Sequence, residues 1–128
     1  MALKRQVGLT QGLRYKGGGP MLVWVLHRIS GIGIALFVGL HILASFSNQL
    51  YGWDLAKSFN TLYLSPYFQI AVFFCALFHA VNGLRITILD LWPKLIEHQR
   101  EAIWVEWGIF LPIYAIAVIV IIQTALGG

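Results

Sequence analysis

The sequence predicts an all-α integral membrane protein with three transmembrane helices. Of its 128 residues, 59% are hydrophobic and only 11% are charged, and the mean hydropathy is +0.76. This composition is too apolar for an ordinary soluble domain. Three apolar runs each approach the ~20 residues that a helix needs to cross a bilayer. Trp and Tyr residues lie near the ends of these runs, as is typical of the boundary between membrane and water.

The net charge of +4 does not indicate a protein that binds nucleic acid. The basic residues gather near the ends of the apolar runs, where they set the topology of a membrane protein. Cys75 is the single cysteine, so the chain has no pair of thiols for an internal disulfide or a thiolate metal cluster. Because Cys75 lies inside an apolar run, we expect it to pack as a small apolar side chain.

Residues 1–20 predict a polar, basic arm on the cytoplasmic side of the membrane. The arm lacks the apolar core of a signal peptide. It ends in a Gly-Gly-Gly-Pro break at residues 17–20, which is typical of a loop followed by a helix start. A transmembrane domain over residues 21–128 follows this arm.

The first span covers about residues 21–48. His27 and Arg28 begin this span, and His41 follows about four turns later on nearly the same face. His41 either hydrogen-bonds to another helix or ligates a haem. Small residues in the same span allow a close approach of a second helix or a cofactor; they are Gly31, Gly33 and Gly39.

The rest of the chain alternates spans with short connectors. Residues 51–65 predict an amphipathic connector that rests at the membrane boundary, to which we assign no chemistry. The second span covers about residues 66–91 and ends before a Trp-Pro pair, because proline does not continue a helix well. Residues 94–101 predict a short charged loop, and the third span follows at about residues 102–126. Glu106 lies near the start of that span, where we expect it to reach water.

The second span carries polar side chains at a depth where hydrocarbon is expected. Ionisable groups inside a membrane helix are costly, so they indicate a functional site. At 100° per residue, His79, Asn82, Gly83 and Asp90 share one face with Ile86, whereas Arg85 points elsewhere. A histidine followed one turn later by a glycine suits the metal and the ring edge of a flat cofactor such as haem. A histidine that hydrogen-bonds across a helix bundle is the other interpretation.

The distribution of charge predicts the topology. Cationic residues flank the start of the first span and the end of the second, whereas the connector between those two spans has only Lys57. The positive-inside rule therefore places the N-terminus in the cytoplasm and the C-terminus outside. Three helices alone leave the face that carries His79 without a partner, so we expect a second membrane subunit to complete the bundle.

Two motifs resemble the cytochrome b membrane-anchor subunit of succinate dehydrogenase, complex II, in its large-anchor type. Residues 26–31 (Leu-His-Arg-Ile-Ser-Gly) open the first span, and residues 78–85 (Phe-His-Ala-Val-Asn-Gly-Leu-Arg) lie in the second. The resemblance covers residues 20–126, nearly the whole chain. The start of the first span and the Asp-Leu-Trp sequence that ends the next one are most similar to the bacterial forms, which are multi-pass proteins of the inner membrane.

The resemblance implies roles for several residues. His79 matches the axial ligand of the b-type haem, whose other ligand comes from a sister anchor subunit. Arg28 matches an arginine that lines the ubiquinone pocket or pairs with a haem propionate, and His27 matches the histidine beside it. Arg85 and Asp90 match positions near the cytoplasmic end of the second span, where Asp90 orients an arginine or helps to deliver protons to quinone.

The chain departs from the common pattern at two positions. Trp24 replaces a serine that contacts the quinone, and Ile86 replaces a histidine near a haem propionate. Trp24 still suits stacking on a quinone ring or donation from its indole N–H, and Ser30 belongs to the same expected haem and quinone pocket. Some anchors of this superfamily hold two stacked haems, and His41 together with His79 fits that scheme.

The function implied by the resemblance is electron transfer to quinone at the membrane face. A flavoprotein subunit oxidises succinate, an iron–sulfur subunit passes the electrons on, and the two anchor subunits hold haem b and form the quinone site. No residue of this chain suits dicarboxylate chemistry. The alternatives are the anchor of a fumarate reductase, a structural anchor without haem, and a small transporter or proton-conducting subunit.

Overall fold

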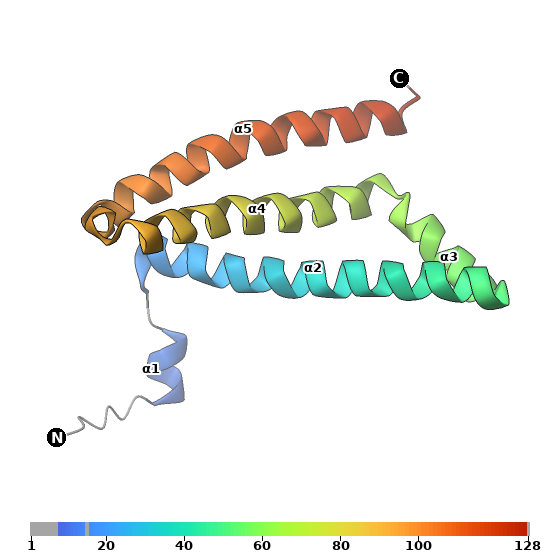
Figure 1. Ribbon diagram of the computed structural model, residues 1–128, viewed down its shortest axis with the longest axis horizontal. Helices are drawn as coiled ribbons and strands as arrows, with labels where there is room; N and C mark the ends of the chain where they lie inside the picture. Colours follow the sequence, from blue (N-terminus) through green and yellow to red (C-terminus); the bar gives the residue numbers. More distant parts are fainter. Residues whose placement is uncertain (1–7, 15, 128) are drawn as a thin grey trace.

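The computed structural model describes residues 8–14 and 16–127, and helices make up most of this part of the chain (Figure 1). In chain order they are α1 (Leu9–Leu13), α2 (Gly18–Tyr51), α3 (Asp54–Tyr63), α4 (Pro66–Leu91), the 3-10 helix η1 (Pro93–His98) and α5 (Gln99–Ala125). The predicted arm thus contains the short α1, and its residues 1–7 and 15 lie outside the described residues.

Three helical stretches are long and apolar enough to cross a membrane, which confirms the predicted all-α membrane fold. They are α2, α4 and the stretch of η1 and α5 from Pro93 to Ala125. α4 lies between α2 and α5 and packs against both along much of its length (Figure 1). Most large apolar side chains of these helices are exposed, as expected of a surface that faces lipid or another membrane subunit.

Glycine and proline mark where the long helices begin and end. Gly52 ends α2 in the left-handed conformation (φ 60°, ψ 30°), and its N–H donates to the carbonyl of Asn48 at 3.0 Å. Glycine is favoured at this position because it has no Cβ to clash. Pro66 and Pro93 stand at the first positions of α4 and η1, where the missing N–H has no helical partner to lose.

Both connectors contain more helix than the sequence indicated. α3 forms within residues 51–65, and the Tyr63 hydroxyl donates to the main-chain carbonyl of Phe37 in α2. The prediction of a loop at 94–101 was wrong, because η1 begins at Pro93 and α5 already begins at Gln99. This segment forms a short helical turn, in which the N–H of Leu95 donates to the Trp92 carbonyl at 2.9 Å. Its polar residues therefore lie on helix and not on a loop.

An aromatic core joins α4 to α5. Phe78 is fully buried, and its ring lies 5.4 Å from that of Phe110 and 5.6 Å from that of Trp107, measured between centroids. Val23 of α2 belongs to the same core. Aromatic pairs at such distances add to the stability that their buried area supplies, so this core fixes how the three helices meet.

Small residues bring α2 close to α4. A Cβ added to Gly33 would lie 2.8 Å from the sulfur of Cys75, which confirms Cys75 as a packing residue between the two helices. By contrast, a Cβ added to Gly39 would meet no atom within 4 Å. Gly31 and Gly33 therefore allow the expected close approach, whereas Gly39 makes no such contact within the described chain.

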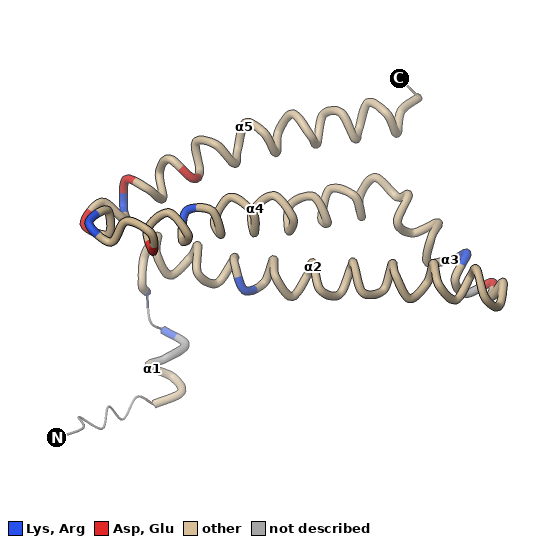
Figure 2. The backbone as a smooth tube through the Cα atoms, viewed as in Figure 1, with Lys and Arg blue, Asp and Glu red and all other residues tan. Residues whose placement is uncertain are grey.

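The charged residues of the three long helices gather toward one end of the bundle. Figure 2 shows most of them where α2 begins and where α4 passes through η1 into α5. A second, smaller group lies on α3, where Lys57 and Asp54 form an exposed pair at 3.4 Å. The end where α2 begins, called here the polar end, carries the candidate site.

Candidate functional site at the polar end of the bundle

His79 of α4 lies against the first half of α2. Its ring stacks on that of His27, with centroids 4.1 Å apart and planes 7° from parallel. Its Nδ1 lies 3.2 Å from the main-chain carbonyl oxygen of His27 and 3.3 Å from Oγ of Ser30. A Cβ added to Gly31 would lie only 3.0 Å from Cε1 of His79. The missing side chain of Gly31 thus makes room for the imidazole.

These contacts assign the proton of the His79 ring. A carbonyl oxygen only accepts, so Nδ1 carries the hydrogen that it donates to His27. The Ser30 hydroxyl donates to the same carbonyl at 2.8 Å. A neutral ring with its proton on Nδ1 has a free lone pair on Nε2, and among the described residues Nε2 has no hydrogen-bond partner. Histidine ligands of metals are commonly oriented in this way, with the other ring nitrogen bonded to a carbonyl.

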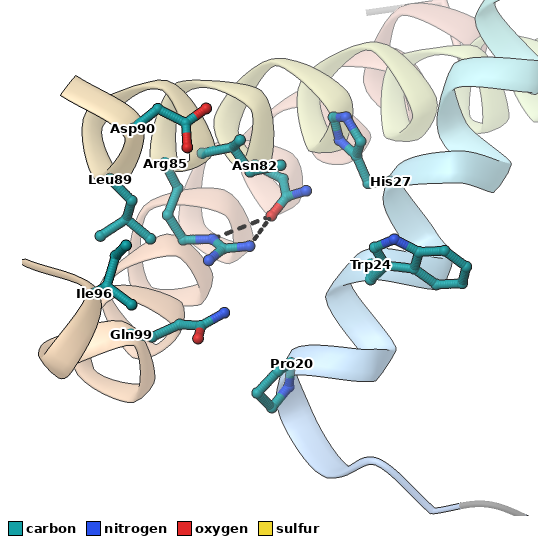
Figure 3. Close-up of a pocket in the computed structure, with 10 residues that line it drawn as sticks. Pro20, Trp24, His27, Asn82, Arg85, Leu89, Asp90, Ile96 and Gln99 are labelled. Carbon is teal, nitrogen blue, oxygen red and sulfur yellow. Dashed lines mark hydrogen bonds between the residues drawn. The ribbon is translucent and has the colours of Figure 1, made fainter. Parts of the chain in front are cut away.

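A cavity of about 300 Å³ opens beside this pair of histidines. Figure 3 shows that α2 forms one side of it, that α4 forms the other, and that residues of η1 and α5 close it. Polar groups from α2, α4 and α5 face an otherwise apolar wall, as is usual for small-molecule sites. The lining residues are Pro20, Trp24, His27, Asn82, Arg85, Ile86, Leu89, Asp90, Ile96 and Gln99.

A buried ion pair lies at the side of the cavity. Nε of Arg85 donates to Oε2 of Glu106 at 2.7 Å, and the two side chains are only 10% and 1% exposed. The same guanidinium donates to Oδ1 of Asn82, from Nη2 at 2.8 Å and from Nε at 3.2 Å. Because the amide oxygen accepts from Arg85, the nitrogen Nδ2 of Asn82 must point the other way (Figure 3).

Three buried polar atoms around this cluster have no hydrogen-bond partner within the described part of the chain. They are Nδ2 of Asn82, Oε1 of Glu106 and Nδ1 of His27. Buried polar groups are normally paired, and leaving one unpaired costs about 1–3 kcal/mol. The cluster therefore has hydrogen-bonding capacity that the described chain alone does not use.

The structure brings together some of the predicted site residues and separates others. Trp24, His27, Arg85 and Asp90 line the cavity together. Arg28 does not line it: its guanidinium carbon lies 4.8 Å from the ring centroid of Trp24, on an exposed face of α2. Ser30, also predicted for this pocket, is fully buried and bonds to the histidine pair instead.

His41 lies far from this cavity. It is exposed, and its ring centroid is 4.8 Å from that of Tyr63 on α3. Four turns of helix separate it from His27, which is about 20 Å along α2. The two deep histidines of the sequence, His41 and His79, therefore stand at different heights of the bundle.

Two expectations about the polar residues were wrong. Arg85 does not point away from Asn82, because its long side chain bends along the helix and bonds to that amide. Glu106 does not reach water: it is 2% exposed and pairs with Arg85. The space over Gly83, which the sequence suggested for a cofactor edge, is bordered by the His27 ring at 3.8 Å from an added Cβ.

The sequence did contain a signal for Glu106. An acidic residue two turns inside an apolar span is costly, and a cation lies at a similar depth in the preceding span. Arg85 and Glu106 carry opposite charges and lie at similar distances from the short connection between their two helices. Two antiparallel helices joined in this way bring such residues together, so the sequence predicts an ion pair between them. Asn82 was noted as polar, but its role as the second acceptor for Arg85 became visible only in three dimensions.

The fold and the site define a multi-pass membrane protein with a cofactor- or ligand-sized cavity at one end of its bundle. Comparison with known proteins adds the family. Residues 3–124 match the family described as the succinate dehydrogenase/fumarate reductase transmembrane subunit. The chain is also 35% identical over 102 residues to the succinate dehydrogenase 2 membrane subunit SdhC of Mycobacterium tuberculosis, covering 76% of this chain and 73% of that protein.

The chain therefore belongs to the succinate dehydrogenase/fumarate reductase transmembrane subunit family. It is a multi-pass membrane subunit of an oxidoreductase complex. This agrees with the resemblance drawn from residues 26–31 and 78–85 at the level of a membrane subunit of succinate dehydrogenase or fumarate reductase.

Proposed function

We propose that this chain is the cytochrome b anchor of a succinate:quinone oxidoreductase, which binds haem b through His79 and helps to form the quinone site. The observation that carries the proposal is the state of the His79 ring. Its Nδ1 is held by the His27 carbonyl at 3.2 Å, and its Nε2 has no hydrogen-bond partner among the described residues. The residues present thus fit an axial haem ligand.

A bound haem would supply one-electron exchange, and the residues of this chain would hold and orient it. His79 would hold the haem iron from this chain, and a sister anchor subunit would supply the second ligand. Gly31 keeps the imidazole in place by leaving room for its edge. His27 and Arg28 lie one turn or less from this contact, where cationic or donating groups suit the carboxylates of haem.

The cavity at the polar end suits the head of a quinone. The Trp24 ring offers a flat surface, and the Arg85 guanidinium offers N–H donors toward a carbonyl oxygen. Reduction of a quinone to a quinol takes two electrons and two protons. The electrons come from the iron–sulfur subunit, and Asp90, which is exposed and lines the cavity, is placed to pass protons in from water.

The expected topology agrees with this role. The polar end carries most of the charged residues (Figure 2), and the positive-inside rule assigns it to the cytoplasm of a bacterial cell. A soluble iron–sulfur subunit with its flavoprotein would dock there. The exposed apolar surfaces of the helices provide the contact area for lipid and for the sister anchor.

Two other functions would use the same site. The reaction can run as fumarate reduction, since the site does not fix the direction. A structural anchor without haem is favoured by one observation, namely that His79 already stacks on His27 and bonds to it within the chain. A second haem at His41 would stand at the other end of α2, beside Tyr63.

Haem stoichiometry in the purified complex tests the proposal. Pyridine haemochrome spectra would be compared for wild type, His79→Ala and His41→Ala. We expect haem in the wild type and its loss in His79→Ala. Loss of a second haem in His41→Ala would add a two-haem path, whereas unchanged haem would leave His41 with a packing role. A wild-type complex with no haem would overturn the cytochrome assignment.

A further inference from the structure

The buried ion pair poses a question that the proposed function leaves open. Glu106 comes from α5, and it is not one of the residues that line the cavity. A carboxylate at this depth in a membrane helix costs free energy, and such residues mark functional sites by default. Its contact is with Arg85, which does line the cavity.

The hydrogen bonds show what Glu106 does to Arg85. A guanidinium has five N–H donors in a rigid plane. Glu106 accepts from Nε at 2.7 Å, and Asn82 accepts from Nη2 at 2.8 Å. Two acceptors on one edge fix both the position and the tilt of the plane. The donors on the opposite edge, which include both hydrogens of Nη1, have no hydrogen-bond partner within the described chain.

The negative charge of Glu106, and not only its shape, is needed to hold the Arg85 guanidinium at the cavity. Without an acceptor on α5, a flexible arginine near a helix end would extend toward water. A charge-assisted bond is about twice as strong as one between neutral groups. The pair therefore holds the guanidinium inward at the cavity, and it is neutral overall, so that its burial is tolerated.

We infer that Glu106 is a positioning residue that fixes Arg85 so that its unpaired N–H groups face the bound quinone oxygen. Asn82 is the second support, and its orientation depends on the same guanidinium. This inference rests on the proposed quinone site. It assigns to α5 a role at a cavity whose predicted residues all came from α2 and α4.

The test uses the whole complex with four variants: Glu106→Gln, Arg85→Gln, the double variant of both, and Glu101→Gln. Glu101 is an exposed carboxylate in the first turn of α5, so its variant is the matched control. Quinone reduction by succinate would be followed with short-chain benzoquinone and naphthoquinone in parallel. Succinate-driven reduction of a phenazine dye measures how much assembled flavoprotein and iron–sulfur subunit is present.

We expect Glu106→Gln and Arg85→Gln each to raise the KM for quinone about tenfold relative to Glu101→Gln, as measured on the complex that assembles. Such a change corresponds to about 1.4 kcal/mol. The double variant should have the KM of Arg85→Gln, because Glu106 acts only through the arginine. A role in folding alone would lower phenazine activity and leave the KM at the control value.

Other results overturn the inference. A KM for Glu106→Gln equal to the control, with Arg85→Gln raised, would remove Glu106 from the site and leave the quinone pocket standing. A double variant with a KM well above that of Arg85→Gln would mean that Glu106 acts independently. An unchanged KM in Arg85→Gln would refute the quinone pocket itself. If Glu106→Gln fails to assemble, a neutral double variant with a KM well above that of Arg85→Gln still overturns the inference.

Discussion

The packing of His79 on α2 depends on the absence of a side chain at Gly31, and Gly31→Ala tests this dependence. The added Cβ would lie 3.0 Å from Cε1 and 3.3 Å from Nδ1 of the imidazole. Carbon atoms in good contact lie about 3.5–4.0 Å apart. The ring would therefore have to move by about 0.5 Å, or α2 and α4 would have to separate.

The expected cost follows from these distances. Overpacking of a tight contact costs about 1–3 kcal/mol. Moving the ring also stretches the 3.2 Å bond from Nδ1 to the His27 carbonyl, which is worth about 1 kcal/mol. We expect a total of about 2–4 kcal/mol against the contact between α2 and α4, or roughly 30-fold to 1,000-fold in its equilibrium constant.

Gly39→Ala is the matched control, because it lies in the same helix and its added Cβ meets nothing within 4 Å. Any gain in helix propensity is common to both variants and cancels. Cys75 reports the contact, since its sulfur packs against Gly33. Short pulses of thiol alkylation at rising SDS concentration, read by mass spectrometry of the Cys75 peptide, give the midpoint of helix separation. Coincident curves for the two variants would refute this account.

Three further outcomes are expected. Glu106→Ala leaves the buried charge of Arg85 unpaired, at a cost of about 3–5 kcal/mol, so immunoblots of membranes should show much less subunit than for Glu106→Gln. Tyr63→Phe removes the hydroxyl that donates to the Phe37 carbonyl; α3 should loosen by about 1 kcal/mol and be cleaved faster by protease added from its side. Gly52→Ala forces a side chain into the left-handed conformation at φ 60°, which costs about 1 kcal/mol, and the thermal midpoint of the complex should fall.

The general fold could be predicted from the sequence, because the length and hydropathy of an apolar run decide whether a helix can span a bilayer. The spans at 21–48, 66–91 and 102–126 correspond to α2, α4 and α5, with ends shifted by a few residues. The shifts have local causes. Pro93 starts a helical turn with a preset φ, so η1 and α5 continue where a loop at 94–101 was expected.

The site could be predicted only in part. The helical periodicity correctly placed His79 and Asn82 on one face of their helix. The direction in which each side chain leaves the helix axis is set by the backbone alone. Periodicity misplaced Arg85, because a long side chain can bend along the helix axis and reach a neighbour that its Cβ does not face. It also misplaced Glu106, because the pattern of one helix does not tell which side of it another helix covers.

The ion pair between α4 and α5 also fixes how these two helices can enter the membrane. Arg85 and Glu106 each lie about two turns from the η1 connection, so the charges meet only when α4 and α5 insert as a closed hairpin. Sliding one helix by a single turn, about 5.4 Å, would leave a cation and an anion separately in hydrocarbon. Register in this hairpin is thus set by electrostatics at its closed end in addition to the aromatic core.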